Sequence, residues 1–337
     1  MKRHVAGMVL VLAGIGQTAD AANVVCVSTA NGIQSALNNA VGNGQDDVIE
    51  IVAGSYALSM KLAFSATEAH PLALVGGFNA GCVGNSGNAT LLDGQHAVQL
   101  LDVFNANGSI AVSQITFIAG TADVGLNAIV TLSSNTGTVI VDRNIFVGNR
   151  SINGIGALSA YAGAGGVRVR ENLVVANRGA LLGGVFVSQS GGESYITGNT
   201  IISNTTDTAG LAGGLGVNGS GHFTISNNII WNNAGATGSD FSTPAAHSRF
   251  ANDIGLVGSS AAADQIVGEQ YVDPQFASCG FLCFELAWYS PLIDAGVDAP
   301  AAGQLGVDLV GKARILGAHV DIGAYENEVI FVDGFEP

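Results

Sequence analysis

One short pattern recurs four times in the middle of the chain and constrains its fold more than any other feature. Each copy holds a β-branched residue, an asparagine three residues later and a second asparagine five residues after that. The first asparagines are Asn144, Asn172, Asn199 and Asn228, spaced by 28, 27 and 29 residues. Such a period, built from short β-branched segments and Gly or Asn turns, is typical of a solenoid. The sequence therefore predicts stacked coils of about 28 residues rather than separate domains.

Each copy is predicted to form one coil of two or three short strands. Its β-branched residue would point inward and stack on its counterpart in the next coil, at about 4.8 Å per coil. These inward positions are Val141, Val169, Ile196 and Ile225. We expect the first asparagine to occupy a tight bend with left-handed backbone, and its amide to bond the same amide one coil on. Roughly nine such coils fit between residues 22 and 276.

The composition agrees with this prediction. Only 11% of the residues are charged, whereas average globular proteins carry about 25%. A mainly helical fold is excluded because exposed helical faces need more charge than this. The net charge is −15, which leaves no patch able to neutralise phosphates, so nucleic acid is excluded as a partner.

The first 21 residues have the features of a secretory signal peptide. Lys2 and Arg3 precede an apolar stretch over residues 5–16, and Ala19 and Ala21 fit a small-x-small cleavage site. No later apolar run reaches the roughly 20 residues that a membrane span needs. The sequence predicts a secreted or cell-surface protein that starts near residue 22 and has no transmembrane segment after cleavage.

Four cysteines in an exported chain predict two disulfides, for which three connectivities exist. Cys279 and Cys283 are close enough to pair within one turn, which leaves Cys26 with Cys82. A metal site is the alternative, but the Cys-x3-Cys spacing is wider than zinc sites use and no histidine lies nearby. We therefore expect no metal.

The repeat resembles the right-handed parallel β-helix, or pectin-lyase-like, superfamily over residues 22–275. This resemblance implies an all-β chain that forms a single-stranded right-handed parallel β-helix. Residues 31–41 carry apolar side chains at helical spacing. In the superfamily such a helix caps the N-terminal end of the coils, which would otherwise expose a sheet edge.

The C-terminal part carries a second resemblance. Its motifs at 272–276, 289–296, 308–314 and 320–326 resemble the choice-of-anchor Q domain, a module that follows β-helices on exported bacterial proteins. We assign residues 276–327 to it, and residues 328–337 to a tail similar to short terminal tags of exported bacterial proteins. Within the module Arg314 is expected to pair with Asp321 or Glu326, and Trp288 to lie in the core.

The superfamily includes enzymes that cleave polysaccharides, and these need particular side chains. A polygalacturonase-like hydrolase needs paired carboxylates, but the only adjacent aspartates, Asp46 and Asp47, lie in the expected N-terminal cap. A calcium-dependent pectate lyase needs clustered acids and a basic residue. The two lysines of the mature chain, Lys61 and Lys312, lie far in sequence from the coil repeats.

Strand alternation predicts which side chains face outward from the glycine-led strands. Two columns are expected, with one member in each of five successive coils. They are Asp102, Thr131, Ser159, Phe186 and Gly216, and Phe104, Ser133, Tyr161, Ser188 and Asn218. One carboxylate and no cation among ten positions do not provide an ion site and a base, so we assign no catalytic residue and no cofactor.

Charged residues in the repeats allow two interpretations. Asp142 with Arg170, and Arg143 with Glu171, share registers in neighbouring coils and are predicted to form a ladder of opposite charges. Arg150 and Arg178 also share a register, and two like charges one coil apart could bind the anionic groups of a glycan. Alternatively, both are solvated loop residues. Trp231 shares a register with apolar residues and is expected to pack rather than bind sugar.

These observations favour a non-catalytic extracellular or surface protein, acting as an elongated scaffold or glycan-binding surface. The candidate ligand-binding residues are Arg150, Arg178, Asp102 and Tyr161. The partner would be a polysaccharide or cell-surface glycan, and the protein a monomer. The alternative is a polysaccharide lyase or glycoside hydrolase that acts on an acidic glycan with an unfamiliar site.

Overall fold

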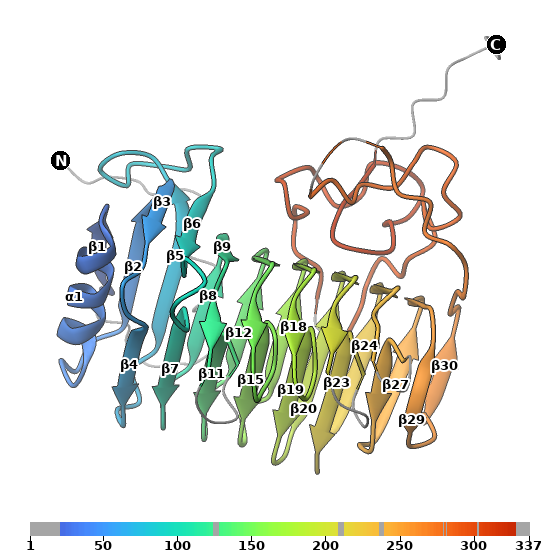
Figure 1. The fold of residues 1–337 in the computed structure, drawn as a ribbon, viewed down its shortest axis with the longest axis horizontal. Coiled ribbons are helices and arrows are strands. Elements are labelled where there is room, and N and C mark those ends of the chain that lie inside the picture. The colour runs from blue at the N-terminus through green and yellow to red at the C-terminus, as the bar shows by residue number, and fades with distance from the viewer. Residues whose placement is uncertain are drawn as a thin grey trace, which may run out of the picture.

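The computed structural model describes residues 21–123, 128–207, 212–235, 239–278, 280, 282–301 and 303–327. The chain winds into a right-handed parallel β-solenoid of about eight turns, close to the nine predicted. Figure 1 shows the turns stacked side by side along the long axis of the molecule. The predicted fold class is confirmed.

Three long sheets and one short sheet form the wall, and neighbouring strands in each are parallel. Sheet 1 contains β4 (Leu62–Ala66), β7 (Leu101–Asn105), β11 (Val130–Ser134), β15 (Leu158–Ala162), β19 (Val185–Gln189), β23 (Leu215–Gly219), β26 (Phe241–Thr243) and β29 (Val257–Ser260). Sheet 2 contains β1 (Asn23–Val27), β2 (Asp47–Val52), β5 (Leu72–Phe78), β8 (Ile110–Ser113), β12 (Val139–Asp142), β16 (Val167–Arg170), β20 (Glu193–Thr197), β24 (His222–Ser226), β27 (His247–Phe250) and β30 (Gln265–Val267). Sheet 3 contains β3 (Gly54–Ala57), β6 (Thr90–Asp93), β9 (Ile115–Ile118), β13 (Ile145–Val147), β17 (Leu173–Val175), β21 (Thr200–Ile202), β25 (Ile229–Trp231) and β28 (Asp253–Ile254). Sheet 4 contains β10 (Thr121–Ala122), β14 (Arg150–Ser151), β18 (Arg178–Gly179) and β22 (Thr205–Thr206).

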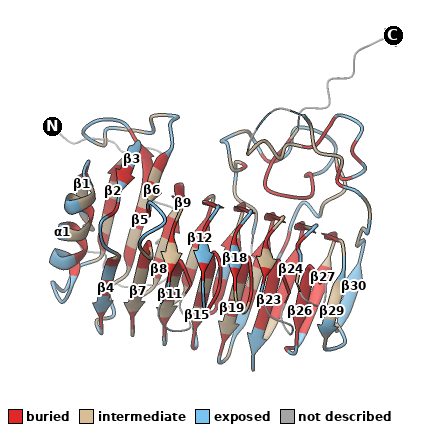
Figure 2. Ribbon diagram, viewed as in Figure 1, coloured by how far each residue is buried: buried red, intermediate tan, exposed pale blue. Residues whose placement is uncertain are grey.

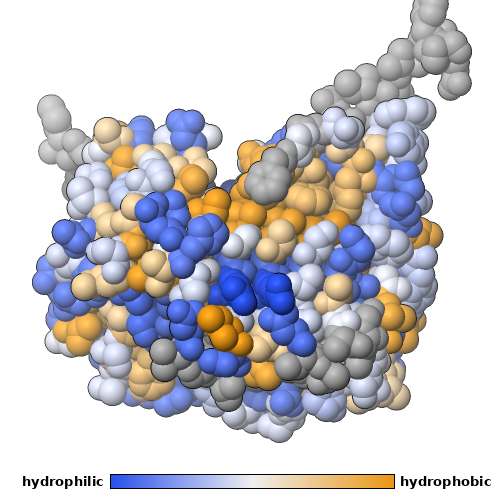
Figure 3. Space-filling model, in the orientation of Figure 1, coloured by the Kyte–Doolittle hydropathy of each residue, from blue (hydrophilic) through white to orange (hydrophobic). Residues whose placement is uncertain are grey.

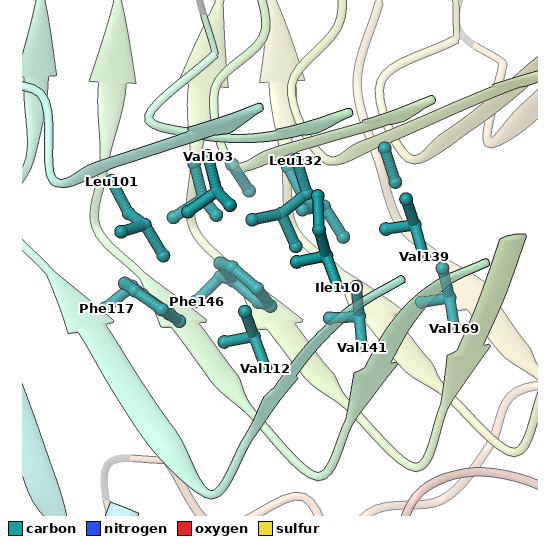
Figure 4. Packing of buried hydrophobic residues seen from close by; sticks show 14 of the residues in the cluster. Leu101, Val103, Ile110, Val112, Phe117, Leu132, Val139, Val141, Phe146 and Val169 are labelled. Atoms are coloured by element: carbon teal, nitrogen blue, oxygen red, sulfur yellow. The ribbon is translucent and has the colours of Figure 1, made fainter. Parts of the chain in front are cut away.

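The interior is filled by apolar side chains that stack from coil to coil. Val141 pairs in register with Val169, Val169 with Ile196, and Ile196 with Ile225, and all four are fully buried. Figure 4 shows such residues converging from sheets 1, 2 and 3. Among them the rings of Phe117 and Phe146 stack with centroids 5.0 Å apart. Each buried aliphatic side chain stabilises the fold by about 2 kcal/mol.

Fully buried asparagines form a ladder at the corner between sheets 2 and 3. The amide of Asn144 donates to Oδ1 of Asn172 at 3.2 Å, and that of Asn172 donates to Asn199 at 2.9 Å. Asn199 donates to Asn228 at 2.8 Å, and Asn228 donates in turn to Asn252 at 2.9 Å. Each Oδ1 also accepts the backbone N–H of the asparagine one coil earlier. The ladder therefore satisfies backbone groups that water does not reach.

The second asparagine of each copy forms a parallel ladder after sheet 3. Asn149 donates to Asn177 at 2.9 Å, Asn177 to Asn204 at 2.9 Å, and Asn204 to Asn233 at 2.9 Å. The ladder ends on a carboxylate, because Asn233 donates to Oδ1 of Asp240 at 2.9 Å.

The left-handed residue at these corners is not the asparagine, so that expectation was wrong. The residue before each ladder asparagine has the positive φ: Arg143 at 53°, Glu171 at 55°, Gly198 at 66° and Asn227 at 56°. This residue turns the chain, and the asparagine that follows is thereby free to project into the coil. We call the residues at this position of successive coils the corner column.

A helix covers the N-terminal end of the coils. Helix α1 (Ala30–Ala40) begins after Thr29, whose hydroxyl accepts the N–H of Gly32, and it buries Ile33 and Leu37. A disulfide joins Cys26 in β1 to Cys82 in the loop after β5. Cys283 is also disulfide-bonded. Its predicted partner Cys279 lies outside the described residues, as do residues 1–20 of the predicted signal peptide and residues 328–337.

Residues 276–327, which we call the terminal segment, fold back over the outer face of sheet 3. Figure 1 shows this segment above the later coils. Its apolar residues pack on Val147, Val175 and Ile202 in one cluster, and on Ile229 and Trp231 in another. The strands of sheet 3 beneath the terminal segment are thus buried on both faces, as Figure 2 shows by colour. The assignment of this segment to a particular domain family stays a prediction.

Replacing a ladder asparagine should destabilise the whole solenoid. Asn172→Ala leaves the buried backbone N–H of Asn144 without its acceptor and breaks the amide ladder toward both neighbouring coils. Each unsatisfied buried group costs about 1–3 kcal/mol, so we expect a loss of about 3 kcal/mol in urea denaturation followed by circular dichroism. The control Asn153→Ala removes an exposed asparagine and should change stability by less than about 0.5 kcal/mol. Equal effects of both variants would contradict a structural role for the ladder.

Candidate functional surface

The outer face of sheet 1 presents the two predicted columns in the predicted order. In the first column Asp102 pairs in register with Thr131, and Ser159, Phe186 and Gly216 follow coil by coil. In the second column Phe104, Ser133, Tyr161, Ser188 and Asn218 follow one another in the same way. The residues between them, such as Leu101 and Val103, point inward and are fully buried.

Hydroxyl and aromatic groups dominate this face. Tyr161 projects along the sheet, and its hydroxyl lies 2.9 Å from Oγ of Ser190 in the next coil. Phe186 packs beside the buried Ile155 and Leu182 at the edge toward sheet 4. The parallel ladder fixes the backbone beneath these groups, so the face is rigid before any ligand arrives.

The one carboxylate of the two columns is paired. Oδ2 of Asp102 lies 2.7 Å from Nζ of Lys61, the residue before β4. Lys61 is far from the coil repeats in sequence but not in space. Strand β4 is the immediate neighbour of β7 in sheet 1, and this pairing brings the lysine to Asp102.

Arg150 and Arg178 are direct register partners in sheet 4. Their backbones therefore lie one coil apart, about 4.8 Å. The two side chains differ in their partners. Arg178 binds Asp207, with Nε donating at 2.7 Å and Nη2 at 2.6 Å. The exposed Arg150 side chain has no ion pair or hydrogen bond with any described residue. Figure 3 shows strongly hydrophilic side chains gathered at the centre of this face, near β18.

The predicted charge ladder is half correct. Arg170 binds Asp142 in the coil before it through two hydrogen bonds, of 2.9 and 2.6 Å. Arg143 does not pair with Glu171. Instead Glu171 lies 3.4 Å from Nε of Arg314 in the terminal segment. Arg314 also lies 3.5 Å from Glu326, one of its two predicted partners, so this arginine bridges the terminal segment and the corner column.

The acids with strongly raised pKa lie inside the protein and away from sheet 1. Burial is the main cause for each, and it raises the pKa of Glu171 to about 8 and that of Glu326 to about 7. Burial also raises the pKa of Asp253 to about 7, and the neighbouring carboxylates of Asp240, Asp273 and Glu269 add to this rise. Raised pKa values often mark catalytic acids. Here all three groups are almost fully buried, and their surroundings identify them as structural.

The prediction that Trp288 lies in the core is wrong. Trp288 was expected in the core, but 86% of its surface is exposed, as is 58% of neighbouring Tyr289. The two rings meet edge to face with centroids 5.4 Å apart. Leu286 and Leu292, which flank the pair, take the buried positions instead. The hydrophobicity of the segment indicated burial correctly but not which residues would achieve it.

The described residues show two further properties of the chain. They contain no group of three His, Cys, Asp or Glu side chains arranged to hold a metal ion. None of their helices has the length and apolar character to cross a membrane.

No protein-family model and no curated protein sequence matches the chain. Among solved structures, a pectate lyase reported as "Crystal structure of pectate lyase Pel9A" aligns with a TM-score of 0.44 and 12% identity. The alignment covers 92% of this chain and 98% of that one. A likeness this distant carries no argument about what the chain binds or does.

The buried Asp253 makes stability depend on pH in an unusual direction. Its Oδ1 accepts the N–H of Val272 and its Oδ2 has no hydrogen-bond partner among the described residues. Because the folded pKa exceeds the ordinary value of 3.8, the folded state binds more protons, and stability falls as pH rises from about 4 to 7. Asp253→Asn removes this dependence.

The test compares the free energy of unfolding of Asp253→Asn and the wild type at several pH values. The free energy of unfolding of the variant, relative to that of the wild type, should increase as pH rises, by up to about 1.4 kcal/mol per pH unit between pH 4 and 7. The control Asp123→Asn replaces an exposed aspartate and should show no such gain. A constant difference between Asp253→Asn and wild type would contradict the raised pKa.

Proposed function

We propose that this protein is an exported, elongated scaffold that binds a polysaccharide or cell-surface glycan on the outer face of sheet 1. The observation that carries the proposal is the pair of in-register columns, in which hydroxyl and aromatic groups recur coil after coil. A repeating surface suits a repeating polymer, since equivalent groups meet successive units of the ligand.

The chemistry of the columns supports a sugar ligand. Aromatic rings such as Tyr161 offer flat apolar faces for the C–H faces of pyranose rings, with a hydroxyl at the edge for hydrogen bonding. Ser133 and Ser159 add hydroxyls that both donate and accept. The sheet is rigid, so little conformational entropy is lost when a ligand binds.

The charges of this surface support binding rather than cleavage. Hydrolysis or elimination needs an acid and a base that are free to exchange protons with the substrate. In the described part of the columns the single acid, Asp102, is bonded to Lys61. We therefore favour a non-catalytic role and keep turnover as the outcome that would overturn it.

Export is supported by the covalent structure. The Cys26–Cys82 bond belongs to an oxidising compartment, since disulfides are rare in cytosolic proteins. A solenoid outside the cell would present sheet 1 directly to extracellular or surface polysaccharides.

Removing the aromatic ring of Tyr161 should weaken glycan binding. A panel of neutral and uronate-containing polysaccharides, tested by affinity electrophoresis, identifies the ligands of the wild type. Tyr161→Ala should weaken binding to those ligands about tenfold, equivalent to about 1.4 kcal/mol. The matched control is Tyr195→Ala in β20, on sheet 2. New reducing ends or unsaturated products would overturn the non-catalytic role, and no binding to any glycan would overturn the proposal.

Arg150 should distinguish acidic from neutral glycans. Its guanidinium is unpaired among the described residues, whereas Arg178 already binds Asp207. Arg150→Ala should therefore weaken binding of uronate-containing glycans more than Arg178→Ala does, and added salt should narrow the difference. Neutral glycans should bind both variants alike. An equal loss for neutral and acidic glycans would show that Arg150 does not contact a ligand charge.

A further inference from the structure

A concave site lies on sheet 3, away from the sheet 1 surface. It is a cleft of about 530 Å³ between the loop after β5 and residues 307–311 of the terminal segment. Its floor is formed by the beginnings of β9 and β13. Figure 1 shows the loop and the terminal segment rising on the same side of the solenoid, and Figure 3 shows apolar side chains bordering the notch between them.

The corner column explains why the cleft is polar on one side. In the later coils this column holds the terminal segment. Glu171 meets Arg314, and the amide of Asn227 bonds both the N–H and the carbonyl of Val297. In the two earlier coils the equivalent residues are Gln114 and Arg143, and both line the cleft. The corner column therefore binds the terminal segment in the later coils, whereas in the two earlier coils its side chains line the cleft.

Arg143 is an uncompensated cation. Its side chain has no hydrogen bond or ion pair with any described residue, although Asp142, Glu171 and Asp308 lie near enough to act on its pKa. Each of these carboxylates is engaged elsewhere. Asp142 binds Arg170, Glu171 faces Arg314, and Asp308 accepts the backbone N–H groups of Val310, Lys312 and Glu326.

Gln114 adds a second donor. Its Oε1 accepts from Nδ2 of Asn85 at 3.0 Å, which fixes the orientation of the amide. Its Nε2 is buried and has no partner within the described residues. A buried donor without an acceptor costs about 1–3 kcal/mol, so a ligand oxygen placed there would recover that energy.

Most of the other side chains in the lining are apolar, and Asn85, Asn88 and Thr116 are the polar ones among them. Ile115 and Ile145 contribute from sheet 3, and Val307, Leu309 and Val310 contribute from the terminal segment. Small-molecule sites typically have about 300–1,000 Å³, mostly apolar walls and a few convergent polar groups. The cleft has the size and the mixture of apolar and polar groups of such a site, and the free groups of Arg143 and Gln114 are both donors.

We propose that this cleft binds an organic carboxylate with an apolar body. The guanidinium of Arg143 and Nε2 of Gln114 would donate to the carboxylate oxygens, and the body would contact Ile145, Leu309 and Val310. One free guanidinium balances a single negative charge, and the neighbouring carboxylates of Asp142 and Asp308 disfavour a second one. A monoanionic carboxylate therefore fits better than a phosphate dianion. This inference does not depend on glycan binding at sheet 1.

The experiment measures binding of 4-phenylbutyrate to the full chain by calorimetry and by ligand-observed NMR. We expect saturable binding, with affinity at least tenfold weaker for 4-phenylbutanol, which lacks the charge. Arg143→Asn should weaken carboxylate binding at least tenfold, and asparagine tolerates the left-handed backbone at this position. Val310→Asp, at a side chain that is 55% exposed, should do the same without threatening the fold.

The matched control is Arg168→Gln, which removes an exposed arginine of β16 on sheet 2 and should leave binding unchanged. Circular dichroism checks that each variant is folded. The proposal is overturned if the folded wild type does not bind the carboxylate, if the alcohol binds equally well, or if Arg143→Asn and Val310→Asp bind as the wild type does. Polysaccharide binding measured on the same variants reports separately on sheet 1.

Discussion

The amide ladders are the interactions on which the rest of the structure depends. A coil that turns sharply three times in about 28 residues must satisfy backbone groups at each corner, where no sheet hydrogen bond is available. The asparagine side chain is short, carries both a donor and an acceptor, and repeats at the coil spacing. It therefore bonds the backbone of its own turn and the amide of the next turn together. This locks the register of all sheets, so every outward column inherits its alignment from the corners.

The corners also determine what happens outside the solenoid. The left-handed residue before each ladder asparagine must project outward, so its identity is free to vary from coil to coil. Glutamate and asparagine at this position hold the terminal segment over sheet 3, while glutamine and arginine in the earlier coils line a cleft. None of the described segments covers sheet 1 in this way. The same corner conformation, repeated in each coil, thus gives a face covered by the terminal segment, a cleft beside that segment and an exposed face.

Sequence reasoning was reliable wherever periodicity governed the outcome. The coil length, the stacking of Val141 on Val169 and the two columns on sheet 1 all follow from a register that repeats, so one coil predicts the next. It failed where contacts are not periodic. The partner of Glu171 is Arg314, 143 positions away along the chain, and no repeat could reveal it. Lys61 reaches Asp102 because β4 and β7 are neighbours although 41 residues separate the charged pair. The candidate columns were thus predictable. Which of the charged residues are paired, and with which partners, was not.

Charged residues that stabilise the fold are buried and paired in this protein, whereas charged residues available to a ligand are accessible and unpaired. Charges that hold the architecture together are inside: Asp142 with Arg170, and Glu171 with Arg314 and Glu326, lie in pairs or networks that exclude water. Such groups are costly to bury and are tolerated only when partnered. Three arginines have no ion pair or side-chain hydrogen bond within the described chain: Arg143, Arg150 and Arg168. Arg143 lies in a cleft and Arg150 beside sheet 1, whereas Arg168 lies exposed on sheet 2, outside both candidate sites. In a chain with so few cations, an unpaired arginine indicates an anion site when other groups converge on it. Arg143 meets this condition, because the free amide of Gln114 and apolar side chains line the same cleft.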